Sequence, residues 1–133
     1  MKVTSFENIT LEDVNVEGAK NAKIRWLIAQ KDKAPNFALR MFEVEVGGFT
    51  PFHNHPWEHE SFVLEGEGEL VLEDDVKPFK KWDVIYIDPN MKHQFRNTGD
   101  TLMRFLCIIP IENKTVPKKK SINPFASGTA NNC

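Results

Sequence analysis

Four histidines are the residues of this 133-residue chain best suited to chemistry, and they lie in two short segments. Three fall within HNHPWEHE, at His53, His55 and His59, and the fourth, His93, falls within DPNMKHQFRN. Neutral imidazole is the commonest side-chain ligand of divalent transition metals, and the chain has no other histidine. The pattern therefore predicts one mononuclear metal site.

The spacing of the histidines predicts where that site lies. Side chains at positions i and i+2 of an extended segment point the same way, so His53 and His55 can share a metal if Phe52–His55 is a strand. The flanking prolines favour this extended conformation. His59 would return from the start of the next strand, and His93 would approach from a distant one. This arrangement predicts a site inside a β-barrel.

The composition is that of an ordinary globular domain, with 41% hydrophobic residues, 27% charged residues and a formal charge of -2. It shows no strongly basic face, which argues against nucleic acid or anionic membrane as a partner. The longest apolar runs fall short of the roughly 20 residues that span a bilayer, and the N-terminus is polar where a secretory signal would be apolar. The two cysteines, Cys107 and Cys133, form no CxxC pair and no disulfide framework. We therefore expect a cytoplasmic protein.

Short runs rich in Val, Ile, Phe and Leu, separated by Gly and Pro, predict an all-β sandwich or barrel with little helix. Residues 62–72, FVLEGEGELVL, are typical of a hairpin in which Gly66 and Gly68 supply positive φ. A second turn is expected at Asn97–Asp100. The expected strands are Lys23–Ala29, Phe37–Val46, Phe52–His55, Glu60–Glu65, Gly68–Glu73, Asp83–Ile87, His93–Asn97 and Leu102–Ile109.

The chain divides into three segments on these grounds. Residues 1–22 alternate irregularly and are expected to form an N-terminal edge strand or a helical turn. Residues 23–111 are expected to form the barrel. Residues 112–133 contain a lysine run, prolines and a polar end, and predict an extended or partly disordered tail.

The first histidine segment resembles the first motif of the cupin family, from Gly47 to Gly66. In that motif a glutamate ligand follows the HxH pair after three or four residues. Here His59 and Glu60 stand at these two spacings, and only His59 has the usual six residues before Gly66. The resemblance implies that His59 replaces the glutamate, as in small bacterial cupins with four-histidine sites, among them manganese cupins of thermophiles. Glu58 and Glu60 are then solvated or hydrogen-bond to a ligand ring.

Residues 82–97 resemble the second cupin motif, and the resemblance as a whole extends from Arg25 to Ile109. The usual glycine, proline and glycine of this motif are replaced by Trp82, Asp88 and Asn90. Asn tolerates the left-handed conformation, so Asn90 can still make the turn before His93. The resemblance implies a double-stranded β-helix, or jelly-roll barrel, with the metal inside.

Four neutral imidazoles would leave the full 2+ charge on the metal, which favours an anionic ligand. An octahedral ion would keep two positions for water, substrate or dioxygen. This suits oxygen chemistry at one Mn(II) or Fe(II) per chain. Zn, Ni or Cu would also be bound in a purified sample, because affinity rises toward the later metals of the row.

Strand alternation places five residues on inward faces, where they are candidates for the substrate pocket. Arg40 would face solvent or lie buried with a carboxylate or an anionic substrate. Cys107 is more often a small buried hydrophobe than a reactive thiol, and the phenylalanines equally fit core packing. The candidates are Arg40, Phe42, Phe95, Phe105 and Cys107.

The primary expectation is a metal-dependent dioxygenase or related oxidoreductase acting on a small polar or anionic organic substrate. One alternative is an isomerase, epimerase or lyase that uses the metal as a Lewis acid, and another is a non-catalytic small-molecule-binding cupin. A homodimer is also expected, with a partner covering the outward residues of Lys23–Ala29, including Trp26, Leu27 and Ile28.

Overall fold

The computed structural model describes residues 1–111, so the predicted tail, residues 112–133, lies outside the described part of the chain. The elements are η1 (Phe6–Asn8), β1 (Glu12–Asp13), β2 (Lys20–Ile28), η2 (Gln30–Asp32), β3 (Phe37–Phe49), β4 (His59–Glu65), β5 (Glu67–Val71), β6 (Val76–Lys80), β7 (Val84–Ile87), β8 (Gln94–Asn97) and β9 (Met103–Pro110). The two helical elements in this part are single 3-10 turns, and no helix there is long and apolar enough to cross a membrane. The all-β class is confirmed.

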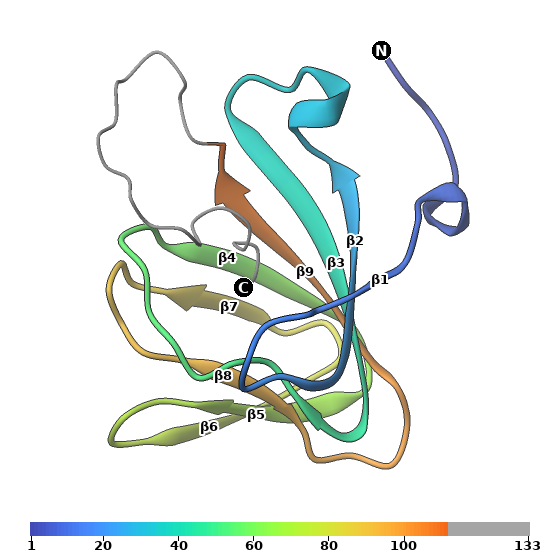
Figure 1. Cartoon of the computed structure of the whole chain (residues 1–133). Coiled ribbons are helices and arrows are strands. Elements are labelled where there is room, and N and C mark those ends of the chain that lie inside the picture. Colours follow the sequence, from blue (N-terminus) through green and yellow to red (C-terminus); the bar gives the residue numbers. More distant parts are fainter. Residues whose placement is uncertain (112–133) are drawn as a thin grey trace.

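The strands form one antiparallel sheet that curls into a half-barrel (Figure 1). Its order is β6-β5-β8-β3-β9-β4-β7, and β2 followed by β1 extends it from the other edge of β3. The long strand β3 pairs with β9 through Phe37–Val44 and then with β8 through Phe49. Because one edge of β3 pairs first with β9 and then with β8, the sheet bends along this strand.

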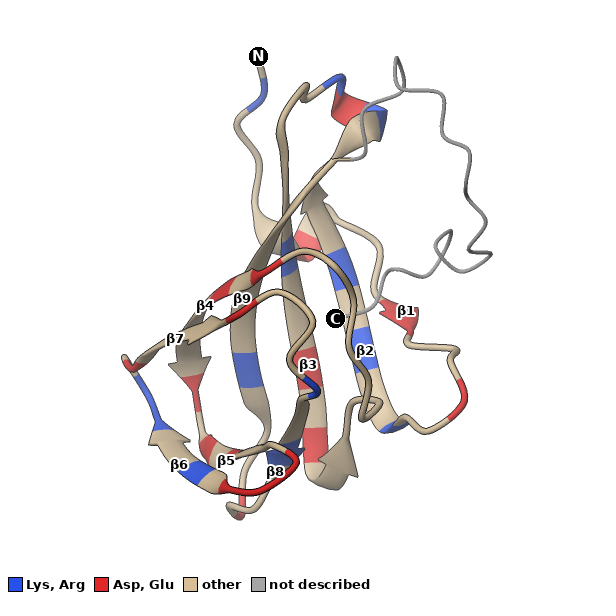
Figure 2. Cartoon of the chain, turned by 90° about the vertical axis from the view of Figure 1, so that its left-hand side faces the viewer, with Lys and Arg blue, Asp and Glu red and all other residues tan. Residues whose placement is uncertain are grey.

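Acidic and basic residues are interspersed along the strands (Figure 2). Among residues 1–111, the most enclosed carboxylate is that of Glu43 on β3, which accepts hydrogen bonds from Nε of Arg25 at 3.4 Å and from Nε of Arg104 at 3.1 Å. Both guanidinium groups also lie over the ring of Phe6, at 5.1 and 5.3 Å. Arg25 Nη1 donates further to the carbonyl oxygens of Phe6 and Ile9. These contacts hold the N-terminal segment against the sheet.

The prediction of a hairpin across residues 62–72 was wrong. β4 pairs with β7 and β9, whereas β5 pairs with β6 and β8. Gly66, the one residue between β4 and β5, has a φ of +81°, and the chain there crosses from one part of the sheet to another. Gly68 is extended, and a Cβ at this position would lie 2.2 Å from the carbonyl oxygen of Arg96. The glycines indicate where β4 ends, but closure of the barrel determines which strands β4 and β5 pair with.

Two turns adopt the left-handed conformation without glycine, at Trp82 with φ 79° and at Asn90 with φ 67°. The turn expected at Asn90 is confirmed. Trp82 also keeps the conformation that the family's glycine would supply, and its exposed indole packs against Phe62 with the ring centroids 5.8 Å apart. The second motif therefore keeps its backbone path although its usual residues are replaced.

The interior of the half-barrel is a column of stacked aromatic rings. Phe105 stacks on Phe42 with centroids 5.1 Å apart and on Phe95 with centroids 4.2 Å apart. His93 meets Phe95 edge to face at 6.5 Å, and the Arg40 guanidinium lies 5.0 Å over Phe42. The inward orientation predicted by strand alternation is confirmed, because these side chains are almost fully buried.

β2 begins at Lys20, three residues before the predicted start. Trp26, which was expected to face outward toward a partner, is partly buried against the core, and the Arg40 guanidinium lies 5.5 Å over its ring. Ile28 is 42% exposed, in agreement with its expected outward orientation. The homodimer stays a prediction.

We expect the substitution Phe105→Ala to lower the free energy of unfolding by about 3–5 kcal/mol, because it removes the central ring of the column and leaves a cavity. The matched control is Val84→Ala on β7, where the side chain is 78% exposed and the expected change is within about 0.5 kcal/mol. Chemical denaturation measures both. Equal losses in the two variants would contradict the placement of the core.

Candidate metal centre

His53 and His55 lie in the loop between β3 and β4, so the predicted strand Phe52–His55 is not formed. In its place is one isolated antiparallel bridge between His53 and His93. The N–H of His53 donates to the oxygen of His93 at 3.1 Å, and the N–H of His93 donates to the oxygen of His53 at 2.9 Å. The prolines on either side of the loop lack an N–H, so they cannot extend this bridge into a ladder.

Two more hydrogen bonds join the same loop to the turn before His93. The N–H of Asn90 donates to the oxygen of His55 at 2.7 Å, and Nδ2 of Asn54 donates to the oxygen of Asn90 at 3.2 Å. The left-handed turn at Asn90 thus faces the first histidine segment directly. Backbone pairing therefore brings the two segments together.

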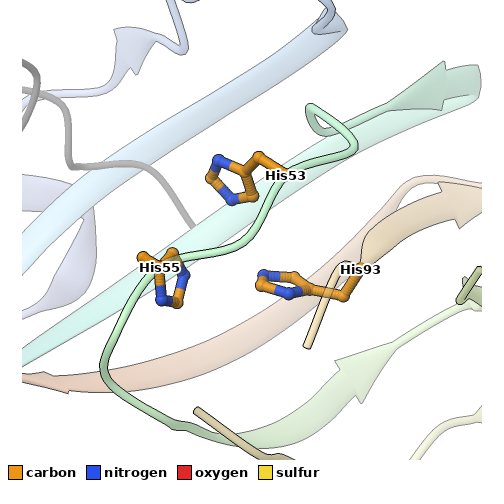
Figure 3. Close-up of side chains that lie close together, drawn as sticks. All are labelled: His53, His55 and His93. Atoms are coloured by element: carbon orange, nitrogen blue, oxygen red, sulfur yellow. The ribbon is translucent and has the colours of Figure 1, made fainter. Parts of the chain in front are cut away.

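Three imidazoles converge on one point, those of His53, His55 and His93 (Figure 3). Each offers one ring nitrogen, and these nitrogens all lie within 4.8 Å of one another. His93 is 1% exposed and the other two rings are half-buried. The described part of the chain thus contains a candidate three-histidine metal site.

Backbone carbonyls define the protonation of two of these rings. Nδ1 of His55 lies 2.9 Å from the oxygen of Trp57, and Nδ1 of His93 lies 2.8 Å from the oxygen of Met91. A carbonyl oxygen only accepts, so each Nδ1 must carry the proton and donate it. In the neutral ring, Nε2 then has a lone pair and is the atom available to a metal.

His59, the first residue of β4, lies beside this cluster and is fully buried. Its Nε2 is 2.9 Å from Nε2 of His55, and its ring centroid is 4.9 Å from that of His93. It does not belong to the group of nitrogens that all lie within 4.8 Å of one another. The four-histidine set therefore stays a prediction.

The donors fit a divalent transition metal in type and in spacing. Two nitrogens about 2.1 Å from one ion at a right angle are about 3 Å apart. The 2.9 Å between the Nε2 atoms of His55 and His59 agrees with such a pair. Imidazole suits several first-row ions, so these donors select no single metal.

Cys107 on β9 lies behind His59, that is, on the Nδ1 side of the ring, whereas Nε2 faces the other histidines. Its Sγ lies 3.0 Å from Nδ1 of His59 and accepts a hydrogen bond from Nη2 of Arg40 at 3.1 Å. Burial raises the pKa of the Cys107 thiol, and the positive charge of Arg40 opposes this effect. Arg40 itself is fully buried, with rings of Trp26 and Phe42 against its guanidinium, which excludes the solvent-facing alternative.

The five predicted pocket residues are buried in two groups. Phe42, Phe95 and Phe105 form the column of rings next to His93, whereas Arg40 and Cys107 lie behind His59. Their role in substrate binding stays a prediction.

Sequence reasoning missed Trp57 as a residue of the site. Its ring stacks on that of His55, with centroids 4.7 Å apart and an angle of 11°, and its carbonyl oxygen accepts the proton on Nδ1 of the same histidine. The available signal was its place between two of the histidines, in HPWEH.

Comparison with known proteins agrees with the fold. Residues 40–109 match the family described as the cupin domain. The chain is 38% identical over 116 residues to the oxalate-binding protein of Thermotoga maritima, a match that covers 82% of this chain and 93% of that protein. The polyketide cyclase RemF from Streptomyces resistomycificus has a similar structure, with a TM-score of 0.80, 34% identity, and coverage of 90% of this chain and 88% of that one.

The chain spans about half the length of two further curated relatives. It matches 52% of an uncharacterized protein of Methanocaldococcus jannaschii and 47% of the 1-methylthio-D-xylulose 5-phosphate methylsulfurylase of Rhodospirillum rubrum. The family match and the structural neighbours together show that the chain belongs to the cupin family, and the expected jelly-roll architecture is confirmed.

We expect Cys107→Ser to be more stable than Cys107→Val. If Cys107 were only a small buried hydrophobe, valine would replace it best. Serine keeps a polar atom for His59 and Arg40, whereas valine removes a hydrogen-bond partner from two buried groups, at a cost of about 1–3 kcal/mol each. Denaturant unfolding of the metal-free variants measures the difference, and a more stable valine variant would show that the polar contacts contribute nothing.

Proposed function

We propose that this protein is a metal-dependent enzyme that binds a carbonyl or carboxylate substrate through two oxygen atoms. The observation that carries the proposal is the convergence of His53, His55 and His93, with the protons of two rings held away from the metal by backbone carbonyls. Neutral donors leave the charge of a divalent ion uncompensated, so an anionic oxygen ligand would bind it well.

We assign the fourth ligand position to His59. Adjacent residues of a strand point to opposite faces, so His59 and Glu60 cannot both face the site. His59 is fully buried and its Nε2 is 2.9 Å from that of His55, whereas Glu60 is exposed on the outer face. Burial, together with the nearby carboxylates of Asp88, Glu58 and Glu60, raises the pKa of Tyr86, which fits an outward Glu60.

Ligation by Nε2 of His59 has a consequence for Cys107. A metal-bound Nε2 carries no proton, so Nδ1 of the neutral ring must carry it and donate it to Cys107 Sγ, 3.0 Å away. Sγ then accepts from both His59 and Arg40. Cys107 and Arg40 are therefore positioning residues that hold the His59 ring from the side opposite the metal.

The reaction that we favour is a non-oxidative conversion of a carbonyl compound, such as an isomerisation, a cyclisation or a lyase reaction. A bound divalent ion would supply Lewis acidity, which stabilises negative charge on a substrate oxygen. The similar polyketide cyclase supports this choice by its name, and the name of the similar oxalate-binding protein supports a carboxylate ligand. Oxalate and polyketides both carry closely spaced oxygens that can chelate one ion.

The chain's own residues would shape the rest of the site. The column of buried rings from Phe95 to Phe42 excludes water from one side of the histidines. The buried guanidinium of Arg40 donates to Cys107 Sγ and so supports the His59 ring through that contact. Both features fit a rigid, dry site in which the divalent ion would supply the positive charge that binds the substrate oxygens. The dioxygenase expected from the sequence stays a prediction.

We expect His59→Ala to lose most of its bound metal and Glu60→Ala to retain it, because only His59 faces the other three imidazoles. Metal content after dialysis, measured separately for protein loaded with zinc(II) and with manganese(II), checks this. Loss of metal from Glu60→Ala with retention in His59→Ala would show that the site is the ordinary cupin set with a glutamate ligand.

For the reaction, we expect turnover by zinc-loaded protein without consumption of dioxygen. Metal-free protein is reconstituted with zinc(II), manganese(II) or iron(II) and tested on β-diketones, catechols and enolisable acids, while the oxygen concentration and the substrate spectrum are recorded. His93→Ala, which removes one of the clustered imidazoles, is the inactive control. Turnover that requires iron or manganese and consumes dioxygen would identify the dioxygenase instead.

A further inference from the structure

A pocket of about 480 Å³ opens between the ends of β2, β3 and β9, and we call it the mouth pocket. Its floor is made of Ala29, Ala38 and Ile109, all of them buried and two of them small. Trp26 and Trp57 line it as well and pack against the same floor. Its volume lies within the range of small-molecule sites, about 300–1,000 Å³.

Of the two tryptophans of the mouth pocket, Trp57 contacts the candidate metal centre directly, and Trp26 is linked to it through Arg40 and Cys107. Trp57 stacks on His55, with the ring centroids 4.7 Å apart. Trp26 lies 5.5 Å from the guanidinium of Arg40, which in turn hydrogen-bonds to Cys107 behind His59. The pocket and the site therefore share the ring of Trp57 as a common wall.

The edge of the mouth pocket is held in place by Asp32. Its carboxylate accepts hydrogen bonds from Lys2 at 2.8 Å and from the N–H of Ala29 at 3.0 Å, and these contacts lower the pKa of Asp32 to about 2. The neighbouring residues Gln30 and Lys31 line the pocket at this edge. A wall that is ordered before binding costs the ligand less to engage.

We propose that the mouth pocket binds an aromatic ring of the substrate, so that the substrate is a planar aryl compound with a chelating pair of oxygens. This inference rests on the proposed function, which supplies the metal for the oxygens. An indole offers a flat apolar face on which another ring stacks favourably. A two-carbon acid such as oxalate would engage the metal and leave this volume unused.

Three probes with the same 1,3-dicarbonyl group test the proposal: acetylacetone, benzoylacetone and the cyclohexyl analogue of benzoylacetone. We expect zinc-loaded protein to bind benzoylacetone about tenfold or more tightly than acetylacetone, because a ring becomes buried and stacked. The saturated ring is expected to bind less tightly than the phenyl ring. Calorimetric titration gives the three dissociation constants.

Tryptophan variants show whether the preference comes from the mouth pocket. Trp26→Leu is expected to abolish most of the preference for benzoylacetone while acetylacetone binding and zinc content stay unchanged, and Trp26→Phe is expected to retain part of it. Trp82→Leu is the matched control, because Trp82 is 61% exposed and lies outside the pocket lining. Thermal unfolding confirms that each variant is folded.

The outcomes separate this inference from the proposed function. Protein that retains zinc and binds acetylacetone, but shows no preference for benzoylacetone or an equal preference in Trp26→Leu, would overturn the aromatic site alone. Protein that retains no zinc would overturn the proposed function, and Trp26-dependent binding of benzoylacetone to that metal-free protein would still support the pocket. An equal affinity for the cyclohexyl and phenyl compounds would show an apolar cavity without aromatic selectivity.

Discussion

Two backbone hydrogen bonds between His53 and His93 close the half-barrel at the point where its chemistry would occur. They join a loop that follows β3 to the segment that enters β8, and the turn at Asn90 adds a third bond from the same side. Without this closure the histidines of the two motifs would lie on separate parts of the sheet. This closure requires the sheet to bend at β3, where the pairing of β3 changes from β9 to β8.

Hydrogen bonds to Nδ1 of the imidazoles then determine which ring nitrogen is available to a metal. Carbonyl oxygens accept the protons on Nδ1 of His55 and His93, and the thiol of Cys107 lies against Nδ1 of His59. The Cys107 sulfur in turn accepts a hydrogen bond from the buried guanidinium of Arg40. These hydrogen bonds leave Nε2 of His55 and of His93 as the atoms available to a metal.

Aromatic packing serves both stability and the site. The rings of Phe95, Phe105 and Phe42 link the edge of His93 to the guanidinium of Arg40, and Trp26 continues the series on the far side of that guanidinium. The same contacts that fill the core therefore position the wall of the mouth pocket.

Features that depend on residue type and on local alternation were readable in the sequence: the all-β class, the histidine segments, the inward faces of β3 and β9, and the left-handed turn at Asn90. Features that depend on partners distant in the chain were not. The Gly66 break does not close a hairpin, Phe52–His55 forms a bridge in place of a strand, and Arg40 and Trp57 take their places only once β2, β3, β4 and β9 surround them. Strand pairing is decided by closure of the whole sheet, and no local pattern encodes which distant edge will be available.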